Sequence, residues 1–258
     1  MNLPEMSRVA LTATQTAGRL LVDMRRHGIT VTERRGIDFT TKADLSSEAL
    51  ITNMLQHAYP SIPLYGEEAR GEIPEHGAVW VVDPLDGTDN YAGNRGPFGV
   101  SIALVENCAS VMGTVFFPLT EETYQGYTGF LSGFQTTGMA SVSKETELKN
   151  STVWTDWSKQ PSDVTLALLQ RLIECSRYPS IRMCATHALM MVATGAIEGY
   201  ACHKLAPEDH AAAGLLVQLA GGTITNMHGD PWTPLSESIV ATNGLIHEEL
   251  LDAISDVV

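Results

Sequence analysis

The stretch Trp80-Val81-Val82-Asp83-Pro84-Leu85-Asp86-Gly87-Thr88-Asp89-Asn90 decides the fold. Its apolar start is typical of a buried strand, which we predict over Val79–Val82, and its acidic second half predicts a loop. Pro84 fixes its own φ and favours extended backbone at the aspartate before it. The backbone N–H groups of Gly87 and Thr88 follow, where the chain can turn into a helix. Carboxylates beside free N–H groups indicate a site that holds cations and phosphate together.

The composition describes a globular protein with an acidic surface. The chain has 258 residues, of which 44% are hydrophobic and 18% charged, with a net charge of −14. This length suffices for one large unit or two smaller lobes with a buried core. The negative charge argues against nucleic acid or an anionic membrane as a partner, and by itself it is typical of a soluble protein.

The cysteines and the N-terminus bear on the compartment. Cys108, Cys175, Cys184 and Cys202 form no C-x-x-C pair and no zinc-binding spacing, so we expect free thiols in a reducing cytoplasm. The first residues, Met1–Leu21, lack the basic start and continuous apolar run of a signal peptide. No uninterrupted apolar stretch is long enough for a transmembrane helix.

The first half of the chain predicts two helices followed by an antiparallel meander. Apolar spacing predicts a helix over Pro4–His27, and a second helix that Asp44 opens as its N-cap and that runs to Tyr59. Ile37–Thr41 is a short predicted strand, and Ile62–Glu68 is predicted to be a loop. The strands expected beside Val79–Val82 are Phe98–Val105, Val111–Phe117 and Glu121–Tyr127.

The second half alternates strands and helices, as layered α/β folds do. It follows Gly129–Asn150, which is rich in glycine, serine and threonine, and there we place the boundary between lobes 1–140 and 141–258 of a single catalytic unit. The predicted helices are Pro161–Cys175, Thr186–Thr194, Pro207–Ala220 and Leu245–Ile254. The predicted strands are Thr152–Thr155, Ile197–Cys202, Thr223–Thr225 and Ile239–Ala241.

Other acidic residues recur in short motifs away from the central stretch. Taken alone, each has an ordinary explanation: Asp44 as a helix cap, and the pair Glu67-Glu68 as solvated surface. Asp209 follows Pro207 at the start of a predicted helix. Carboxylates that converge repel one another and raise each other's pKa unless a cation is bound, so a cluster of them favours a metal site.

Taken together, these motifs resemble the inositol monophosphatase family of metal-dependent phosphomonoesterases. The signature turn is Asp83-Pro84-Leu85-Asp86-Gly87-Thr88, and its companions are Gly66-Glu67-Glu68, Asp44 before a helix, and Pro207-Glu208-Asp209 before a helix that ends in Ala220-Gly221-Gly222. Their order and spacing match over nearly the whole chain. The resemblance implies an α/β fold, the αβαβα sandwich of the inositol monophosphatase and fructose 1,6-bisphosphatase type. It also implies a homodimer that Li⁺ inhibits.

The resemblance also assigns roles to individual residues. It implies two or three Mg²⁺ ions, which cancel charge, activate water and stabilise the leaving oxygen of a phosphate ester. The Mg²⁺ ligands it implies are Glu67, Asp83, the carbonyl of Leu85, Asp86 and Asp209. Thr88, polarised by Asp44, would orient the attacking water. The N–H groups of Gly87 and Thr88 would hold phosphate oxygens.

The chain departs from the family pattern where the substrate would bind. Cys202 stands where inositol-selective members usually carry a glutamate, and a thiol is a poor hydrogen-bond acceptor. Glu208 replaces a frequent tryptophan. Residues expected near the substrate are Ala185, His187, Cys202, His203 and Lys204. For His187 a place in the core is an equal alternative, and for His203 and Lys204 a solvated loop is the alternative.

We therefore expect a cytoplasmic Mg²⁺-dependent phosphatase that hydrolyses a small polyol or sugar phosphate, with no nucleic-acid or membrane partner. Histidinol phosphate, fructose 1,6-bisphosphate and 3′-phosphoadenosine 5′-phosphate are alternative substrates on the same scaffold. A non-catalytic regulatory or binding protein would be expected to lack at least one of the motif residues, and here all are present.

Overall fold

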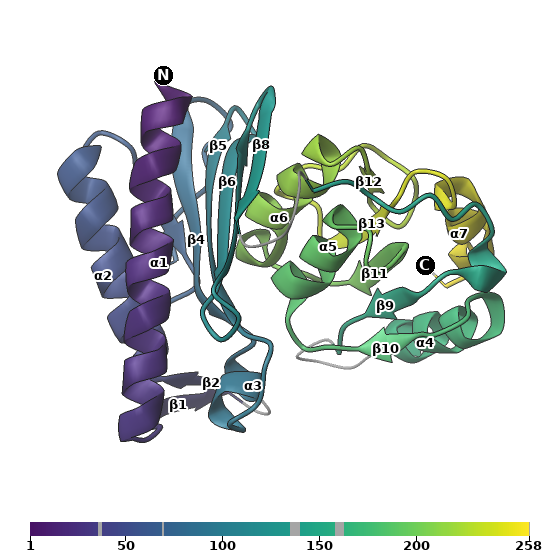
Figure 1. Ribbon diagram of the computed structural model, residues 1–258, viewed down its shortest axis with the longest axis horizontal. Coiled ribbons are helices and arrows are strands. Elements are labelled where there is room, and N and C mark those ends of the chain that lie inside the picture. Colours follow the sequence, from purple (N-terminus) through teal and green to yellow (C-terminus); the bar gives the residue numbers. More distant parts are fainter. Residues whose placement is uncertain (36–37, 69, 135–139, 158–162, 258) are drawn as a thin grey trace.

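The computed structural model describes residues 1–257 except 36–37, 69, 135–139 and 158–162. Two large sheets alternate with three layers of helices, and the five layers follow one another across the molecule (Figure 1). This confirms the αβαβα sandwich.

The first layer consists of two helices that cover one face of the larger sheet. They are α1 (Leu3–His27) and α2 (Lys42–Ala58). Small residues of α1, among them Ala10, Ala13 and Ala17, are fully buried, which brings the helix close to the strands. On the sheet they meet Trp80, Val82 and other residues of the same apolar cluster.

The larger sheet has six strands and is antiparallel except at one edge, where β3 runs parallel to β4. Its strands, in spatial order, are β3 (Leu64–Gly66), β4 (Ala78–Asp86), β5 (Gly99–Glu106), β6 (Ala109–Phe117), β7 (Glu122–Tyr127) and β8 (Phe130–Phe134). Trp80 and Val82 face the first helical layer, whereas Val79 and Val81 face the next one. Burial on both faces explains the continuous apolar run that marks β4 in the sequence.

The middle layer consists of α5 (Ala185–Ala193) and α6 (Pro207–Leu219), which lie between the two sheets (Figure 1). Both helices are apolar around most of their circumference: Ala188, Leu189, Leu216 and Val217 are all fully buried. They share one apolar cluster with residues of both sheets, so this cluster joins the two halves of the chain.

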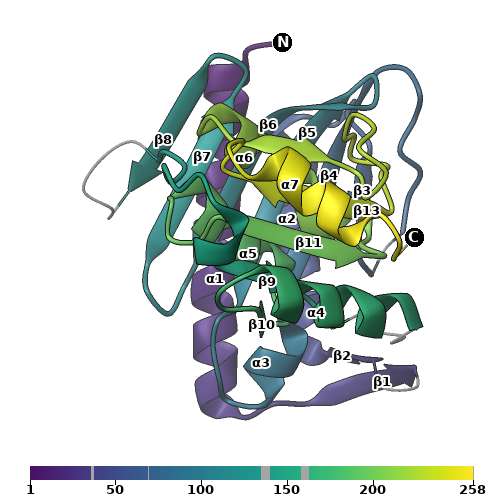
Figure 2. The same ribbon diagram turned by 90° about the vertical axis from the view of Figure 1, so that its right-hand side faces the viewer.

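The second sheet has five strands in the order β10 (Ser180–Ile181), β9 (Val153–Thr155), β11 (Gly199–His203), β13 (Ser238–Thr242) and β12 (Thr223–Thr225). The strands β10, β9 and β11 are parallel, and β13 is antiparallel to both of its neighbours. The last layer is α4 (Asp163–Cys175) and α7 (His247–Ile254), which cover the outer face of this sheet, in front in Figure 2. Smaller elements complete the fold: the hairpin β1 (Val31–Arg35) and β2 (Asp38–Thr41), a 3₁₀ turn at Leu148–Asn150, and α3 (Thr88–Ala92).

The predicted helices and the antiparallel meander are confirmed, with ends that shift by a few residues. Five points about the strands need correction. Ile62–Glu68, predicted as a loop, contains β3, because main-chain pairing with β4 orders it. The strand predicted to end at Val82 continues to Asp86. The aperiodic region after Gly129 begins with β8, which a turn connects to β7.

The other two corrections are strands that were not predicted: the polar β1 forms only by pairing with β2, and the two-residue β10 only by pairing with β9. The predicted start of a strand at Ile37 and the predicted start of a helix at Pro161 lie outside the described residues. The cysteines are free, as expected. None of the described helices is both long and apolar enough to cross a membrane.

Candidate active site

Asp44 lies in the first turn of α2 with both carboxylate oxygens engaged. Its Oδ2 accepts a hydrogen bond from the backbone N–H of Thr41 at 2.8 Å, and its Oδ1 accepts one from Thr88 Oγ1 at 3.1 Å. The predicted N-cap at Asp44 is wrong: Thr41 caps the helix, and Asp44 is the third helical residue of a capping box. The capping hydrogen bond thus fixes the Asp44 carboxylate through Oδ2, while Oδ1 faces Thr88.

The two aspartates of the signature motif lie at the end of β4 rather than in a turn beyond it. Asp83 pairs with Ser101 and Asp86 with Gly99, and the register shifts between them. Because side chains alternate along a strand, Asp83 faces the same side as Val81, toward α6. Its Oδ1 accepts a hydrogen bond from the Leu85 N–H at 2.9 Å.

Asp86 is buried and held by the segment that leads into α5. Its Oδ2 accepts hydrogen bonds from the Thr186 N–H at 2.7 Å and from Cys184 Sγ at 3.2 Å. Both donors converge on one oxygen of the carboxylate.

Gly87 and Thr88 turn the chain from β4 into α3. Gly87 has φ +85° and caps the helix, a conformation that glycine adopts without steric cost. A Cβ there would also lie 2.9 Å from the carbonyl oxygen of Pro97. Thr88 is therefore the first helical residue, and its hydroxyl lies 3.1 Å from Asp44 Oδ1 and 3.0 Å from the carbonyl oxygen of Leu85. A hydroxyl that donates its one proton here keeps lone pairs that can accept a hydrogen bond from water.

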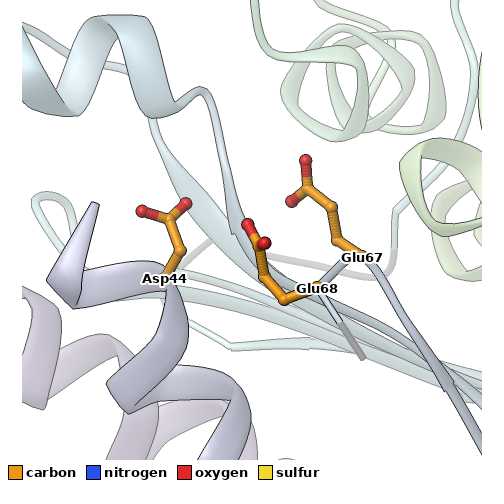
Figure 3. Close-up of side chains that lie close together, drawn as sticks. All are labelled: Asp44, Glu67 and Glu68. Atoms are coloured by element: carbon orange, nitrogen blue, oxygen red, sulfur yellow. The ribbon is translucent and has the colours of Figure 1, made fainter. Parts of the chain in front are cut away.

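Glu67 and Glu68 follow β3 and bring two further carboxylates to Asp44. One oxygen from each of Asp44, Glu67 and Glu68 lies within 4.8 Å of the others. Figure 3 shows the three side chains close together. Glu68 also accepts a hydrogen bond from Thr40 Oγ1 at 3.0 Å. The proximity of Glu68 was not predicted from the sequence, in which the pair is equally typical of surface.

Asp209 lies in the first turn of α6, which carries it toward β4. Its Oδ2 accepts a hydrogen bond from the Ala206 N–H at 2.8 Å. Its neighbour Glu208 is 3% exposed and is hydrogen-bonded to Tyr65 of β3. Small residues at the helix–sheet contact allow this approach.

The electrostatics of these residues show that they form one acidic cluster. Burial raises the pKa of Asp83 well above its ordinary value, and the negative charges of Glu67, Asp86 and Asp209 raise it further. Burial likewise raises the pKa of Asp86, against the hydrogen bonds from Thr186 and Cys184 that lower it. Burial raises the pKa of Asp44 to about 6, and the charge of Glu67 adds to that shift. The carboxylates predicted from four separate motifs are therefore brought together.

This donor set fits a hard divalent cation such as Mg²⁺. It is made of oxygen atoms, and the raised pKa values of Asp83 and Asp86 reflect the cost of holding these two carboxylates ionised without a counter-charge. A cation would remove that cost. Asp83, Asp86, Asp209 and Glu67 are the residues that would hold it, and the carbonyl oxygen of Leu85, which lies 3.0 Å from Thr88 Oγ1, is a further candidate ligand.

Two of the residues predicted near the substrate lie on α5. Ala185 is buried at its start, directly before Thr186, which contacts Asp86. The ring of His187 stacks on Trp154 with centroids 6.1 Å apart and meets the edge of Phe117 at 5.2 Å. Burial lowers the pKa of His187 to about 4. These contacts correspond to the alternative of a neutral histidine at the edge of the core.

The other three predicted residues lie at the end of β11 and are not brought together. Cys202 is 1% exposed and packs in the central apolar cluster. Because side chains alternate, His203 faces the other way, where its neighbours include Glu237 and His228. Lys204 follows the strand with φ +63° and is exposed.

Sequence reasoning missed Asp156, which directly follows β9 and is 7% exposed. Burial raises its pKa to about 7, and the negative charge of Asp86 contributes. An acid at the end of a buried strand is the signal that marks Asp83, and it could have found Asp156 as well. Thr186 was also missed, because a backbone N–H donor leaves no trace in the sequence.

Comparison with known proteins agrees with this geometry. The model of the inositol monophosphatase family matches residues 2–258. The chain is 28% identical to an inositol-1-monophosphatase of Bacillus subtilis, over 97% of each chain, and 28% identical to the Nus factor SuhB of Escherichia coli, over 97% of this chain and 96% of the relative.

Among solved structures, the extragenic suppressor protein SuhB of Bartonella henselae superposes with a TM-score of 0.90. It is 28% identical, and the match covers 98% of this chain and all of that one. From its motifs, its layers and these relatives, the chain belongs to the inositol monophosphatase family of phosphoric monoester hydrolases.

Proposed function

We propose that this protein is a Mg²⁺-dependent phosphomonoesterase that acts on a small polyol or sugar phosphate. The observation that carries the proposal is the position of Thr88. Thr88 begins α3, and its hydroxyl is hydrogen-bonded to Asp44 of α2. Beside it lies the acidic cluster whose members come from β4, α6 and the segment after β3. An acidic cluster that only bound a cation would not need this hydroxyl.

The residues divide the work of hydrolysis among them. Mg²⁺, when bound, supplies positive charge that stabilises the transition state and favours deprotonation of water. Thr88 accepts a hydrogen bond from the attacking water and donates its own proton to Asp44, which orients that water toward phosphorus. Asp44 is fixed by Thr41, so the hydroxyl is oriented before substrate arrives. The N–H groups of Gly87 and Thr88 are proposed to hold the phosphate oxygens.

The substrate is proposed to be small and polar, with a recognition that differs from that of inositol-selective relatives. Cys202 supports this, because its buried thiol offers no carboxylate for the hydroxyl groups of a ring. Contacts of Ala185, His187, His203 and Lys204 with the substrate stay predictions. So do Li⁺ inhibition, the number of Mg²⁺ ions, the cytoplasmic location and the homodimer, which light scattering of the purified protein would test.

Phosphate release from a panel of monoesters tests the proposal. The panel holds inositol 1-phosphate, histidinol phosphate, fructose 1,6-bisphosphate and 3′-phosphoadenosine 5′-phosphate. We expect hydrolysis that EDTA stops and added Mg²⁺ restores, with one substrate preferred. Hydrolysis that continues at full rate in EDTA would contradict the metal-dependent reaction.

Asp86→Asn tests the metal ligand set. The amide has the same shape, so no cavity forms, but the anionic oxygen that would face the cation is lost. We expect turnover to fall at least about 100-fold, because charge stabilisation of the transition state is lost. Circular dichroism should show an unchanged fold. Full activity of this variant would show that Asp86 is no ligand.

A regulatory role is a second candidate, since a relative from Escherichia coli is named a Nus factor and one from Neisseria meningitidis a putative Nus factor. It does not require hydrolysis, so Asp86→Asn separates the two. A cellular phenotype of gene deletion that Asp86→Asn complements fully would favour the regulatory role, whereas loss of complementation would favour the phosphatase.

A further inference from the structure

The buried carboxylate of Asp156 has no part in the reaction as described above, yet it lies next to the residues that hold Asp86. It follows β9 in the second sheet, whereas Asp86 ends β4 in the first. The segment between them is Arg182–Cys184, which leads into α5. We refer to Arg182–Cys184 as the clamped segment.

Both carboxylate oxygens of Asp156 accept hydrogen bonds from other groups of the protein. Its Oδ1 accepts from the N–H groups of Met183, at 2.5 Å, and Trp157, at 3.1 Å. Its Oδ2 accepts from the N–H of Cys184 at 3.1 Å, with the Tyr200 hydroxyl at 3.5 Å. Four donors occupy the lone pairs of a carboxylate, so Asp156 is not available to a substrate hydroxyl.

The clamped segment is also held from the opposite side. The side-chain NH₂ group of Asn90, on α3, lies within hydrogen-bond distance of three carbonyl oxygens, those of Pro97 at 2.9 Å, Arg182 at 3.0 Å and Met183 at 3.3 Å. Met183 has φ +54°, a left-handed conformation that a residue with a side chain keeps only where its surroundings enforce it. Asp156 and Asn90 together enforce it, one from each half of the molecule.

The residue after Met183 is Cys184, whose side chain contacts Asp86. Cys184 and Thr186 donate to the same oxygen, Oδ2, and thereby set the orientation of this carboxylate. Groups that hydrogen-bond a metal ligand from behind typically control metal affinity, at 10–100-fold per group.

We propose that Asp156 is a positioning residue for Asp86: it holds the clamped segment in the one conformation in which Cys184 and Thr186 present Asp86 to the cation. This inference rests on the proposed function, because it assumes that Asp86 binds Mg²⁺.

Asp156→Asn is the direct test, since asparagine has the same size but places an NH₂ group against backbone donors. Calorimetric titration of Mg²⁺ into the purified protein should give a dissociation constant about 10-fold higher than that of the unsubstituted protein. The matched control is Asp252→Asn, the same change at an exposed position on α7, and it should leave the constant unchanged. At saturating Mg²⁺, kcat of Asp156→Asn should return close to the unsubstituted value.

A second pair of variants tests the route of the effect. Cys184→Ala removes one donor to Asp86, so Asp156→Asn should weaken Mg²⁺ binding less in that background than alone. If Asp156→Asn does not fold, Asn90→Ser loosens the clamped segment from its other side and should raise the dissociation constant as well.

The outcomes separate the inference from the proposed function. Equal Mg²⁺ affinity of the folded Asp156→Asn variant and the unsubstituted protein, with only thermal stability reduced, would overturn the inference and leave the phosphatase proposal intact. Failure of the unsubstituted protein to bind Mg²⁺ at all would overturn both.

Discussion

At the scale of single residues, the site depends on carboxylates whose oxygens are already partly committed. Asp44 uses one oxygen for its helix cap and turns the other to Thr88. Asp86 gives one oxygen to the donors before α5. In each case a structural hydrogen bond fixes the side chain and leaves its second oxygen for chemistry, which is how preorganised sites avoid reorientation during a reaction.

Thr88 provides the sharpest prediction at this scale. Thr88→Val keeps the shape of the side chain but removes the hydroxyl, so the attacking water loses its acceptor. We expect kcat to fall about 100-fold with KM little changed, because the contact matters in the transition state. Thr88→Ser retains the hydroxyl and should keep most of the activity. If the valine variant were as active as the serine variant, the proposed role of the hydroxyl would be wrong.

At the scale of elements, the site exists because α6 packs tightly on the first sheet. Gly113 of β6 faces this helix, and a Cβ there would lie 2.7 Å from the carbonyl oxygen of Ala212. Asp209 lies in the first turn of this helix, so the distance of the helix from the sheet sets how near Asp209 comes to Asp83. Packing and catalysis are therefore coupled through one interface.

Gly113→Ala tests that coupling. The added methyl group meets backbone, which cannot rotate away, so the helix must shift. We expect the free energy of unfolding to fall by about 1–3 kcal/mol, measured by urea denaturation. We also expect weaker Mg²⁺ binding, since Asp209 moves with its helix. Unchanged stability and unchanged Mg²⁺ affinity would show that the contact between β6 and α6 accommodates the added methyl group without a shift of the helix.

At the scale of the whole molecule, the buried acids make stability depend on pH and on metal. A carboxyl group whose pKa is raised on folding stabilises the fold while protonated. That contribution is lost as the pH rises through the folded pKa, which is about 6 for Asp44 and about 7 for Asp156. His187 and His210, whose pKa values burial lowers to about 4, oppose this trend below their ordinary pKa of 6.5.

Mg²⁺ should therefore stabilise the protein more at high pH than at low pH. Its ligands must be ionised to bind it, and because burial raises the pKa values of Asp83 and Asp86, protons compete with Mg²⁺ more strongly at pH 5 than at pH 8. At pH 8 and a Mg²⁺ concentration 100 times the dissociation constant, we expect a rise in Tm of about 5–10 °C. Comparison with and without Mg²⁺ at each pH cancels the histidine contribution. An equal rise in Tm at pH 5 and pH 8 would contradict the assignment of these carboxyls as ligands.

Much of the fold could be predicted because its elements carry local signals. The spacing of apolar residues predicts α1 and α4, and the short apolar run that ends in Asp83-Pro84 predicts β4. The strands β1, β3, β8 and β10 could not be predicted, because their polar or short sequences become strands only by pairing with a neighbour.

The candidate site, like the fold, has features that the sequence predicts and features that depend on the tertiary structure. By itself, the sequence determined the chemical types: Asp44, Glu67, Asp83, Asp86 and Asp209 stand in recognisable motifs, because metal chemistry requires particular side chains at particular spacings. Only the tertiary structure decided that Thr41 rather than Asp44 caps α2, that Glu68 joins the cluster, and that Asp156 is bonded to the segment behind Asp86. These are distances and backbone hydrogen bonds between segments far apart in the chain, and no local pattern encodes them.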